Sequence, residues 1–153
     1  MTTVIATTIE PPRQPEITEL LRLGDEFTRM LYPPDSCYLL NTTELEADNV
    51  TVFVARVDGE ALGMAALVDR GDTSAELKRM FVHDNARGRG LASDLLTAIE
   101  RHARSASIRV IQLETGPKQL AALALYEKHG YHRIPNFGQY VGDDFSVCME
   151  LSL

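Results

Sequence analysis

The sequence predicts a mixed α/β domain in which helices cover both faces of a central sheet. In the first half, apolar runs at residues 50–57 and 61–68 flank Asp58-Gly59, a dipeptide typical of type I′ hairpin turns. In the second half, strand and helix patterns alternate from residue 75 to residue 151. Hairpins followed by such alternation imply one sheet with helices packed on it. Because 153 residues suit one domain of ordinary size, we expect residues 1–153 to form a single domain.

The N-terminal segment has the pattern of a strand followed by a helix. Residues 2–9 read as a strand, and three prolines within residues 11–15 then force a turn. Apolar residues recur at helical spacing over residues 16–31, where we expect Gly24 to bend or break the helix. Residues 41–48 predict a short helix or turn before the hairpin.

Two further helices are predicted in the second half of the chain. Residues 91–104 carry an amphipathic pattern, and residues 118–129 are followed by Gly130, which fits the position just beyond a helix C-terminus. The remaining strands are predicted at residues 75–82, 108–113, 131–134 and 145–151.

Composition excludes several classes of partner. The formal net charge of −7 argues against a nucleic-acid-binding protein, since that affinity depends on many lysines and arginines. No apolar run approaches the roughly 18 residues of a membrane span, and the N-terminus lacks the features of a secretory signal. We therefore expect a cytoplasmic protein without a membrane partner. Cys37 and Cys148 are expected to be reduced thiols in such a chain.

A basic, glycine-rich turn is the most informative motif, Arg87-Gly88-Arg89-Gly90-Leu91-Ala92. It lies between a predicted strand and a predicted helix, where unpaired N–H groups and the helix dipole favour an anion. The glycines remove Cβ atoms that would keep a phosphate away from these amides. Taken alone, the turn fits a pyrophosphate site and an ordinary strand-to-helix connection equally well. A Rossmann fingerprint fits worse because Ser93 stands where glycine or alanine is needed, and no Walker A motif occurs.

This turn resembles the signature of the GNAT superfamily of N-acetyltransferases, Arg/Gln-x-x-Gly-x-Gly/Ala between a strand and a helix. The resemblance extends from Glu76 to Tyr131. It includes Leu113-Glu114-Thr115-Gly116 and the run Ala-Leu-Ala-Leu-Tyr-Glu-Lys-His-Gly-Tyr at residues 122–131. It implies the GNAT fold, with a central twisted sheet of about six to seven strands that is mixed but mostly antiparallel.

The resemblance also implies acetyl-CoA as co-substrate. The pyrophosphate would bind at Arg87, Gly88, Arg89, Gly90, Leu91 and Ala92. The pantetheine arm would lie where two central strands splay apart at a bulge, paired with the backbone of Met80, Phe81 and Val82. Gln119 stands where many relatives carry asparagine, so an amide is available there with a longer reach.

Two residues are candidates for catalysis. Tyr126 matches the family tyrosine that faces the cofactor sulfur, and a phenol with a reference pKa of about 10 could protonate the departing thiolate. Glu76 stands where several relatives carry a general base that deprotonates the attacking amine. The alternative interpretations are that Tyr126 packs in the core and that Glu76 is a surface residue paired with Lys78 or Arg79. A water relay in place of Glu76 also stays open.

The resulting hypothesis is an acyltransferase that moves acetyl from acetyl-CoA to a small-molecule or peptide primary amine by direct attack in a ternary complex. The alternative is a non-catalytic acyl-CoA-binding sensor or assembly module. A homodimer is kept open because dimers are common among similar proteins. No metal is expected, since Gly130 interrupts the helix between His129 and His132 and no further ligands complete a site. A chemical role for Cys148 or His83 is left undecided.

Overall fold

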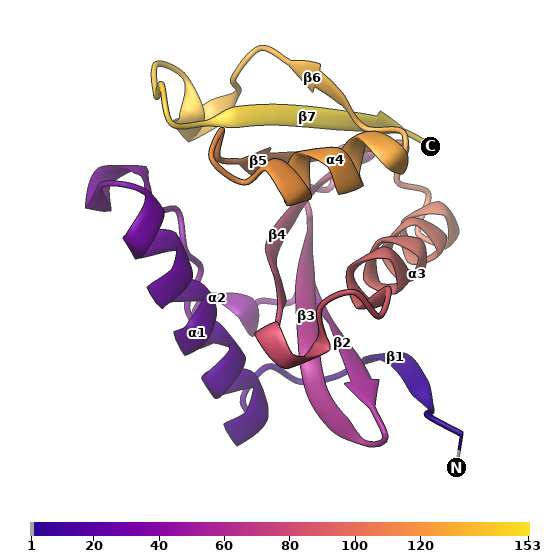
Figure 1. Ribbon diagram of the computed structural model, residues 1–153. Coiled ribbons are helices and arrows are strands. Elements are labelled where there is room, and N and C mark those ends of the chain that lie inside the picture. Colours follow the sequence, from indigo (N-terminus) through magenta and orange to yellow (C-terminus); the bar gives the residue numbers. More distant parts are fainter. Residues whose placement is uncertain (1) are drawn as a thin grey trace.

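The computed structural model describes residues 2–153 and contains a seven-stranded sheet with the strand order β1-β2-β3-β4-β5-β7-β6 (Figure 1). The strands are β1 (Ile5–Ile9), β2 (Val50–Val57), β3 (Glu60–Asp69), β4 (Ser74–Val82), β5 (Val110–Thr115), β6 (His132–Ile134) and β7 (Val147–Ser152). Neighbouring strands pair antiparallel except β4 and β5, which are parallel. The predicted mixed, mostly antiparallel sheet is confirmed.

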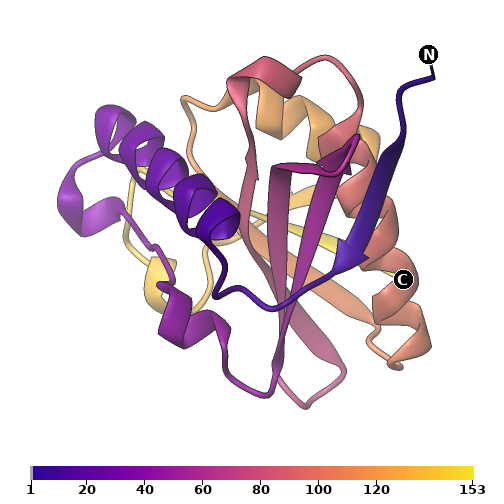
Figure 2. The ribbon, with the colours of Figure 1, turned by 90° about the horizontal axis from the view of Figure 1, so that it is seen from below.

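Helices cover both faces of this sheet, as predicted. The α-helices are α1 (Pro15–Leu31), α2 (Thr42–Leu45), α3 (Leu91–Ser105) and α4 (Leu120–Lys128). Figures 1 and 2 show α1 on one side of the sheet and α3 on the other. Apolar side chains of α1 and α2 form one core with β2 and β3, whereas those of α3 and α4 form a second and larger core with the central strands. Each amphipathic helix therefore buries its apolar stripe against one face of the sheet.

The predicted hairpin is present, and the helix at Gly24 and the start of β5 are among the points where the structure differs from the sequence-based prediction. Asp58 and Gly59 have φ values of 49° and 88°, as a type I′ turn requires. Helix α1 is unbroken at Gly24, because the ring of Phe81 packs there and a Cβ would lie 3.6 Å from it. Strand β5 begins at Val110 rather than at residue 108, because the Ile108 amide still donates to the carbonyl of Ala103 at the end of α3.

Strands β4 and β5 separate at the centre of the sheet. Their pairing ends at Leu77 and Leu113, so beyond Leu77 β4 has no strand partner on the β5 side. Arg79 adopts φ 59° at an irregularity in the β3–β4 register. Its guanidinium holds this conformation by donating to Asp25 Oδ1 at 2.5 Å and to the Leu21 carbonyl at 3.1 Å, both on α1. The bulge that the family resemblance implied is therefore present in β4.

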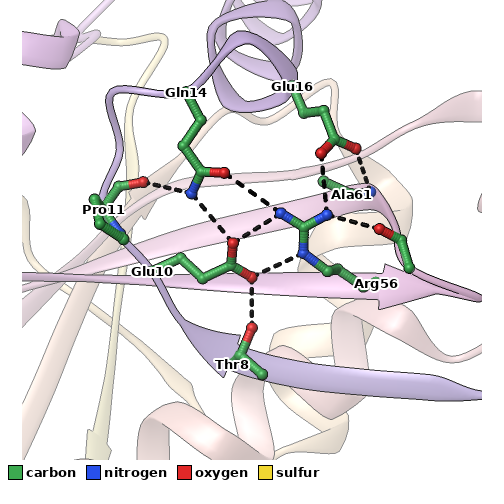
Figure 3. Close-up of polar contacts among 8 residues, drawn as sticks. Thr8, Glu10, Pro11, Gln14, Glu16, Arg56 and Ala61 are labelled. Carbon is green, nitrogen blue, oxygen red and sulfur yellow. Dashed lines mark hydrogen bonds and ion pairs between the residues drawn. The ribbon is translucent and has the colours of Figure 1, made fainter.

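A polar cluster fixes the start of α1 against the β2–β3 hairpin (Figure 3). Arg56 makes a bidentate contact with Glu10, at 2.9 and 2.7 Å, and donates to Glu16 Oε1 at 3.0 Å. The second oxygen of Glu16 accepts the backbone N–H of Ala61 at 3.0 Å. The Arg56 guanidinium lowers the pKa of Glu10 to about 2, so this carboxylate is ionised throughout the neutral range. The cluster determines where α1 crosses the sheet.

Gly116, between β5 and α4, makes the tightest glycine contact in the structure. A Cβ built there would lie 1.7 Å from the hydroxyl oxygen of buried Tyr32, which also accepts the N–H of Lys118 at 3.2 Å. We expect Gly116→Ala to lower the free energy of unfolding by about 2–3 kcal/mol, as overpacking does. Urea denaturation would measure the loss. Gly24→Ala is the matched control, because its Cβ would make an ordinary contact within a helix and should stabilise by up to about 1 kcal/mol. Equal stability of the two variants would contradict this account.

Candidate functional site

A cavity of about 800 Å³ lies at the separation of β4 and β5. Its walls come from α1, the segment after α1, the second half of β4, the N-terminus of α3, the end of β5 and α4. The volume lies within the range of about 300–1,000 Å³ that is usual for small-molecule sites. Of the predicted site residues, the cavity is lined by Met80, Phe81, Val82, Arg87, Gly88, Gly90, Leu91, Ala92, Gln119 and Tyr126. The structure thus brings together two motifs that lie more than thirty residues apart in the sequence.

One end of the cavity is shaped to receive an anion. Gly88 and Gly90 have φ values of 79° and 80°, and a Cβ on either residue would meet no atom within 4 Å. The first hydrogen bond of α3 runs from the Asp94 amide to the Gly90 carbonyl. The amides of residues 91–93 precede it and have no acceptor among residues 2–153. Three free donors, the helix dipole and absent Cβ atoms make this turn an anion cradle.

The two arginines of the turn differ in position. Arg87 lines the cavity, where its guanidinium lies 5.6 Å from the centre of the Phe27 ring and 3.1 Å from Asp84 Oδ1. Arg89 is exposed and is not among the residues that line the cavity. Arg87 is therefore the better placed of the two to contact a bound phosphate.

A polar link joins α3 and α4 beside the anion cradle. The Ser93 hydroxyl lies 2.8 Å from His129 Nε2, and His129 Nδ1 lies 3.5 Å from Glu100 Oε1. These contacts occupy His129 within the protein and tie the C-terminal end of α4 to the first turn of α3. In the sequence, His129 stands out only as a candidate metal ligand, and no local pattern indicates this contact.

Tyr126 lies in α4 and faces the cavity. It is 5% exposed, and its ring packs edge-to-face on Tyr131 with ring centres 5.7 Å apart. Within residues 2–153, burial and the charge of Glu114 act on its hydroxyl, and no hydrogen bond does. Burial, with a smaller contribution from the charge of Glu114, raises its pKa above the ordinary value, so the phenol keeps its proton at neutral pH. Tyr126 therefore both packs in the core and lines the cavity, so the two alternative interpretations of this residue are compatible.

Gln119 precedes α4 and lines the cavity with part of its amide already engaged. Its Oε1 accepts the Gly116 amide at 3.1 Å and the Thr115 hydroxyl at 3.4 Å. The Nε2 donors remain for a ligand. The Gln119 side chain therefore folds back onto the preceding loop.

Glu76 is held away from the cavity. Its Oε2 accepts the Tyr140 hydroxyl at 2.6 Å, and its Oε1 accepts Arg70 Nη2 at 3.2 Å. Lys78 Nζ lies 3.7 Å from Oε2. Glu76 is not among the cavity-lining residues, and the pairing with Lys78 that the sequence analysis kept as an alternative is present. A carboxylate with both oxygens occupied is poorly placed to take a proton from a ligand in the cavity.

Glu114, at the end of β5, is the carboxyl group that lines the cavity. Its Oε2 accepts the Ser146 hydroxyl at 2.8 Å. Burial raises the pKa of Glu114 to about 7, although the Ser146 hydrogen bond and the charge of Lys78 oppose the shift. A carboxyl that titrates near neutral pH is suited to general base catalysis. The sequence analysis quoted Glu114 only as part of a motif and assigned it no role.

A pair of hydrogen bonds closes the wall opposite α4. The hydroxyls of Tyr38 and Ser36 donate to the two carboxylate oxygens of Asp143 at 2.6 and 3.1 Å. Tyr38 and Ser36 line the cavity, and Asp143 belongs to the loop before β7. Two loops more than a hundred residues apart in the chain therefore shape the end of the cavity near Glu114.

The other candidate residues have structural surroundings. Cys148 and Cys37 are free thiols, and burial raises the pKa of the Cys148 thiol within β7, which disfavours a nucleophilic thiolate. His83 Nδ1 accepts the Asn85 amide at 3.1 Å in the turn after β4. Within residues 2–153, no group of three or more His, Cys, Asp or Glu residues could hold a metal ion. None of the helices in that range combines the length and apolar character that a bilayer crossing demands.

Comparison with known proteins places these features in a family. Residues 15–131, more than half of the chain, match the family model described as "Acetyltransferase (GNAT) family". The "IAA acetyltransferase" of Azospirillum brasilense is 37% identical over 145 residues, which span 94% of this chain and 95% of that protein. The "Aminoglycoside N(6')-acetyltransferase type 1" of Salmonella typhimurium is 28% identical over 67% of this chain and 79% of its own length.

Solved structures share the fold. A Klebsiella pneumoniae protein, whose assignment as an acyl-CoA N-acyltransferase is itself provisional, superposes with a TM-score of 0.83 at 31% identity, over 97% of each chain. The PaiA N-acetyltransferase of Thermoplasma acidophilum, solved in complex with coenzyme A, superposes with a TM-score of 0.76 at 16% identity over 100% of each chain. The predicted resemblance and fold are confirmed.

Proposed function

Since this chain belongs to the GNAT acetyltransferase family, we propose that it transfers the acetyl group of acetyl-CoA to a primary amine by direct attack in a ternary complex. One observation carries the proposal: a single cavity joins the anion cradle to Tyr126 and to the carboxyl of Glu114. Such a cavity contains the parts needed for binding a diphosphate and for moving two protons.

The residues present fit acetyl-CoA. The free amides of residues 91–93 and the open space at Gly88 and Gly90 suit its pyrophosphate, and Arg87 adds a positive charge. The unpaired edge of β4 beyond Leu77, which includes Met80, offers backbone groups to an extended amide chain such as pantetheine. When bound, acetyl-CoA supplies an activated acetyl thioester.

The proton transfers are assigned to two side chains. An alkylammonium, with a reference pKa of about 10.4, cannot attack until it loses a proton. Glu114 accepts that proton at the carboxylate, with Ser146 holding one of its oxygens. Tyr126 holds a proton at its hydroxyl and donates it to the leaving thiolate. Glu114 takes the role that the sequence analysis gave to Glu76, because Glu114 lines the cavity and Glu76 does not.

The comparisons support nitrogen as the acceptor atom. The aminoglycoside relative is named for acetylation at a nitrogen, and the Thermoplasma protein is an N-acetyltransferase that was solved with coenzyme A. The Azospirillum relative is named for IAA, and that name does not state which atom of IAA is acetylated.

An acetylation screen with detection of free thiol tests the proposed function. Purified protein and acetyl-CoA are combined with amino acids, polyamines, amino sugars and peptides at pH 8, and thiol release is measured against a control without acceptor. We expect acceptor-dependent release from at least one class. Binding of CoA without thiol release from any class would favour an acyl-CoA sensor instead.

The anion cradle makes a separate prediction about affinity. We expect Gly90→Ala to weaken CoA binding about tenfold, because alanine resists the left-handed conformation by about 1–2 kcal/mol and its methyl group would enter the cradle. Isothermal titration calorimetry would measure the dissociation constant. Gly71→Ala is the control, since Gly71 has φ 78° and open surroundings but lies outside the cavity. Equal CoA affinity in both variants would show that the pyrophosphate does not bind at this turn.

A further inference from the structure

A buried ammonium group lines the cavity next to Glu114. Lys78 directly follows the last residue of β4 that pairs with β5, and its side chain is 9% exposed. Its Nζ donates to the Tyr140 hydroxyl at 2.7 Å, and this is its one hydrogen bond to residues 2–153. Glu76 Oε2 lies 3.7 Å away, within the range of an ion pair. An ammonium carries three donors, so one is left after the Tyr140 hydrogen bond and the ion pair with Glu76.

Two other cations that line the cavity are held by contacts with α1. Arg79 donates to Asp25 and to the Leu21 carbonyl, and Lys118 Nζ donates to the Leu31 carbonyl at 2.9 Å. Glu76, the carboxylate nearest to Lys78, is shared with Arg70. Lys78 is therefore a buried cation whose ion-pair partner is shared with Arg70 and which keeps one donor for a ligand. Such a group is suited to bind an anion that enters the cavity.

Lys78 and Glu114 stand side by side at the point where the strands separate. Each follows a member of the last β4–β5 pair, Leu77 and Leu113. The charge of Glu114 acts on Lys78 and that of Lys78 acts on Glu114, which places the two groups in the same electrostatic environment. The last paired residues, Leu77 and Leu113, lie on strands about 4.8 Å apart, so the long side chains one residue further on can both contact one small ligand.

We propose that the acceptor is a short aminocarboxylate, such as a free amino acid, whose carboxylate binds Lys78 while its amine lies at Glu114. This inference rests on the proposed function and specifies its acceptor class. An ionised carboxylate accepts a charge-assisted hydrogen bond from the remaining donor of Lys78. Lys78 is then a specificity residue, and Glu114 keeps its role as the base.

The wild-type enzyme tests the inference without any substitution. We measure kcat and KM for free amino acids and for the corresponding carboxamides, which keep the amine and lack the negative charge. We expect kcat/KM to be at least tenfold higher for the acids. Thermal denaturation in the presence of CoA gives a second readout, in which the acids should raise Tm and the carboxamides should not.

Variants then assign the preference to Lys78. Lys78→Met keeps the length of the side chain and removes the charge, so KM for the acids should rise at least tenfold. At a pH well above the pKa of Glu114, where the base stays ionised without the charge of Lys78, kcat should change less than threefold. Lys78→Arg should recover part of the preference. Lys118→Met is the matched control, because Lys118 also lines the cavity but its ammonium donates to the end of α1 and its charge is not among those that act on Glu114; it should leave the preference unchanged.

Several results would overturn the inference. Equal use of acids and carboxamides by the wild-type enzyme would exclude recognition of a carboxylate, and this comparison decides even if Lys78→Met does not fold. A loss of kcat for both ligand classes in Lys78→Met would instead assign Lys78 to the reaction itself. In both cases acetyl transfer persists and the proposed function stands. Absence of thiol release with any amine would remove the proposed function and this inference together.

Discussion

Replacement of Glu114 by glutamine is expected to lower kcat by about a hundredfold or more, since general base catalysis contributes roughly 10²–10⁴ in rate. Glutamine preserves the shape of the side chain and can still accept the Ser146 hydrogen bond, but it cannot take a proton. Steady-state kinetics with the best acceptor from the thiol-release screen would measure the loss. The dissociation constant of CoA should change less than threefold, because the anion cradle is unaltered.

The pH profile separates a base from a structural carboxylate. Glu114 must be ionised to accept a proton, so wild-type kcat/KM should rise as the pH increases through about 7, the pKa to which burial raises this group. Deprotonation of the acceptor amine adds its own rise at higher pH. We expect kcat/KM of the Glu114→Gln variant to lose the rise near pH 7 and to keep the rise at higher pH that comes from deprotonation of the amine. If kcat/KM of the variant still rises through pH 7, the ionisation of Glu114 is not the cause of that rise.

Glu76→Gln is the matched comparison. Glu76 is bound by Tyr140 and Arg70 outside the cavity, so its replacement should reduce kcat less than tenfold and leave the rise in kcat/KM near pH 7 in place. The reverse pattern, with Glu76→Gln inactive and Glu114→Gln active, would return the base to Glu76.

Tyr126→Phe is expected to lower kcat at least tenfold, which corresponds to about 1.4 kcal/mol of activation free energy. The variant removes the hydroxyl that protonates the thiolate and keeps the ring that packs on Tyr131. CoA affinity, measured by calorimetry, should stay within a few-fold of the wild-type value. An unchanged kcat would show that Tyr126 is not the acid.

Tyr131→Phe controls for the loss of a buried hydroxyl. The Tyr131 hydroxyl is buried and has no hydrogen-bond partner among residues 2–153, and Tyr131 does not line the cavity. We expect this variant to keep kcat within twofold of wild type. A loss as large as that in Tyr126→Phe would indicate that repacking of α4, rather than proton transfer, lowers the rate.

Features encoded in short stretches were predictable from the sequence. The hairpin at Asp58-Gly59 and the turn at Gly88 and Gly90 depend on backbone conformations that few residue types adopt, so local chemistry identifies them. Helices α3 and α4 follow from apolar spacing and from the glycine after α4. The boundary of β5 was missed because the Ile108 amide closes the turn after α3, a competition that apolar patterning does not reveal.

By itself, the amino-acid sequence determined the class of fold, the family and the anion cradle, because each depends on neighbouring residues or on a spaced motif. Only the tertiary structure shows that Glu114 lines the cavity and Glu76 does not. Glu76 and Glu114 lie on adjacent strands, and no local pattern distinguishes them. The contacts of Glu76 come from Tyr140 and Arg70, and the surroundings of Glu114 come from Ser146 and the separated strands. A side chain's burial and partners depend on segments distant in the chain, and these set which carboxyl group can accept a proton.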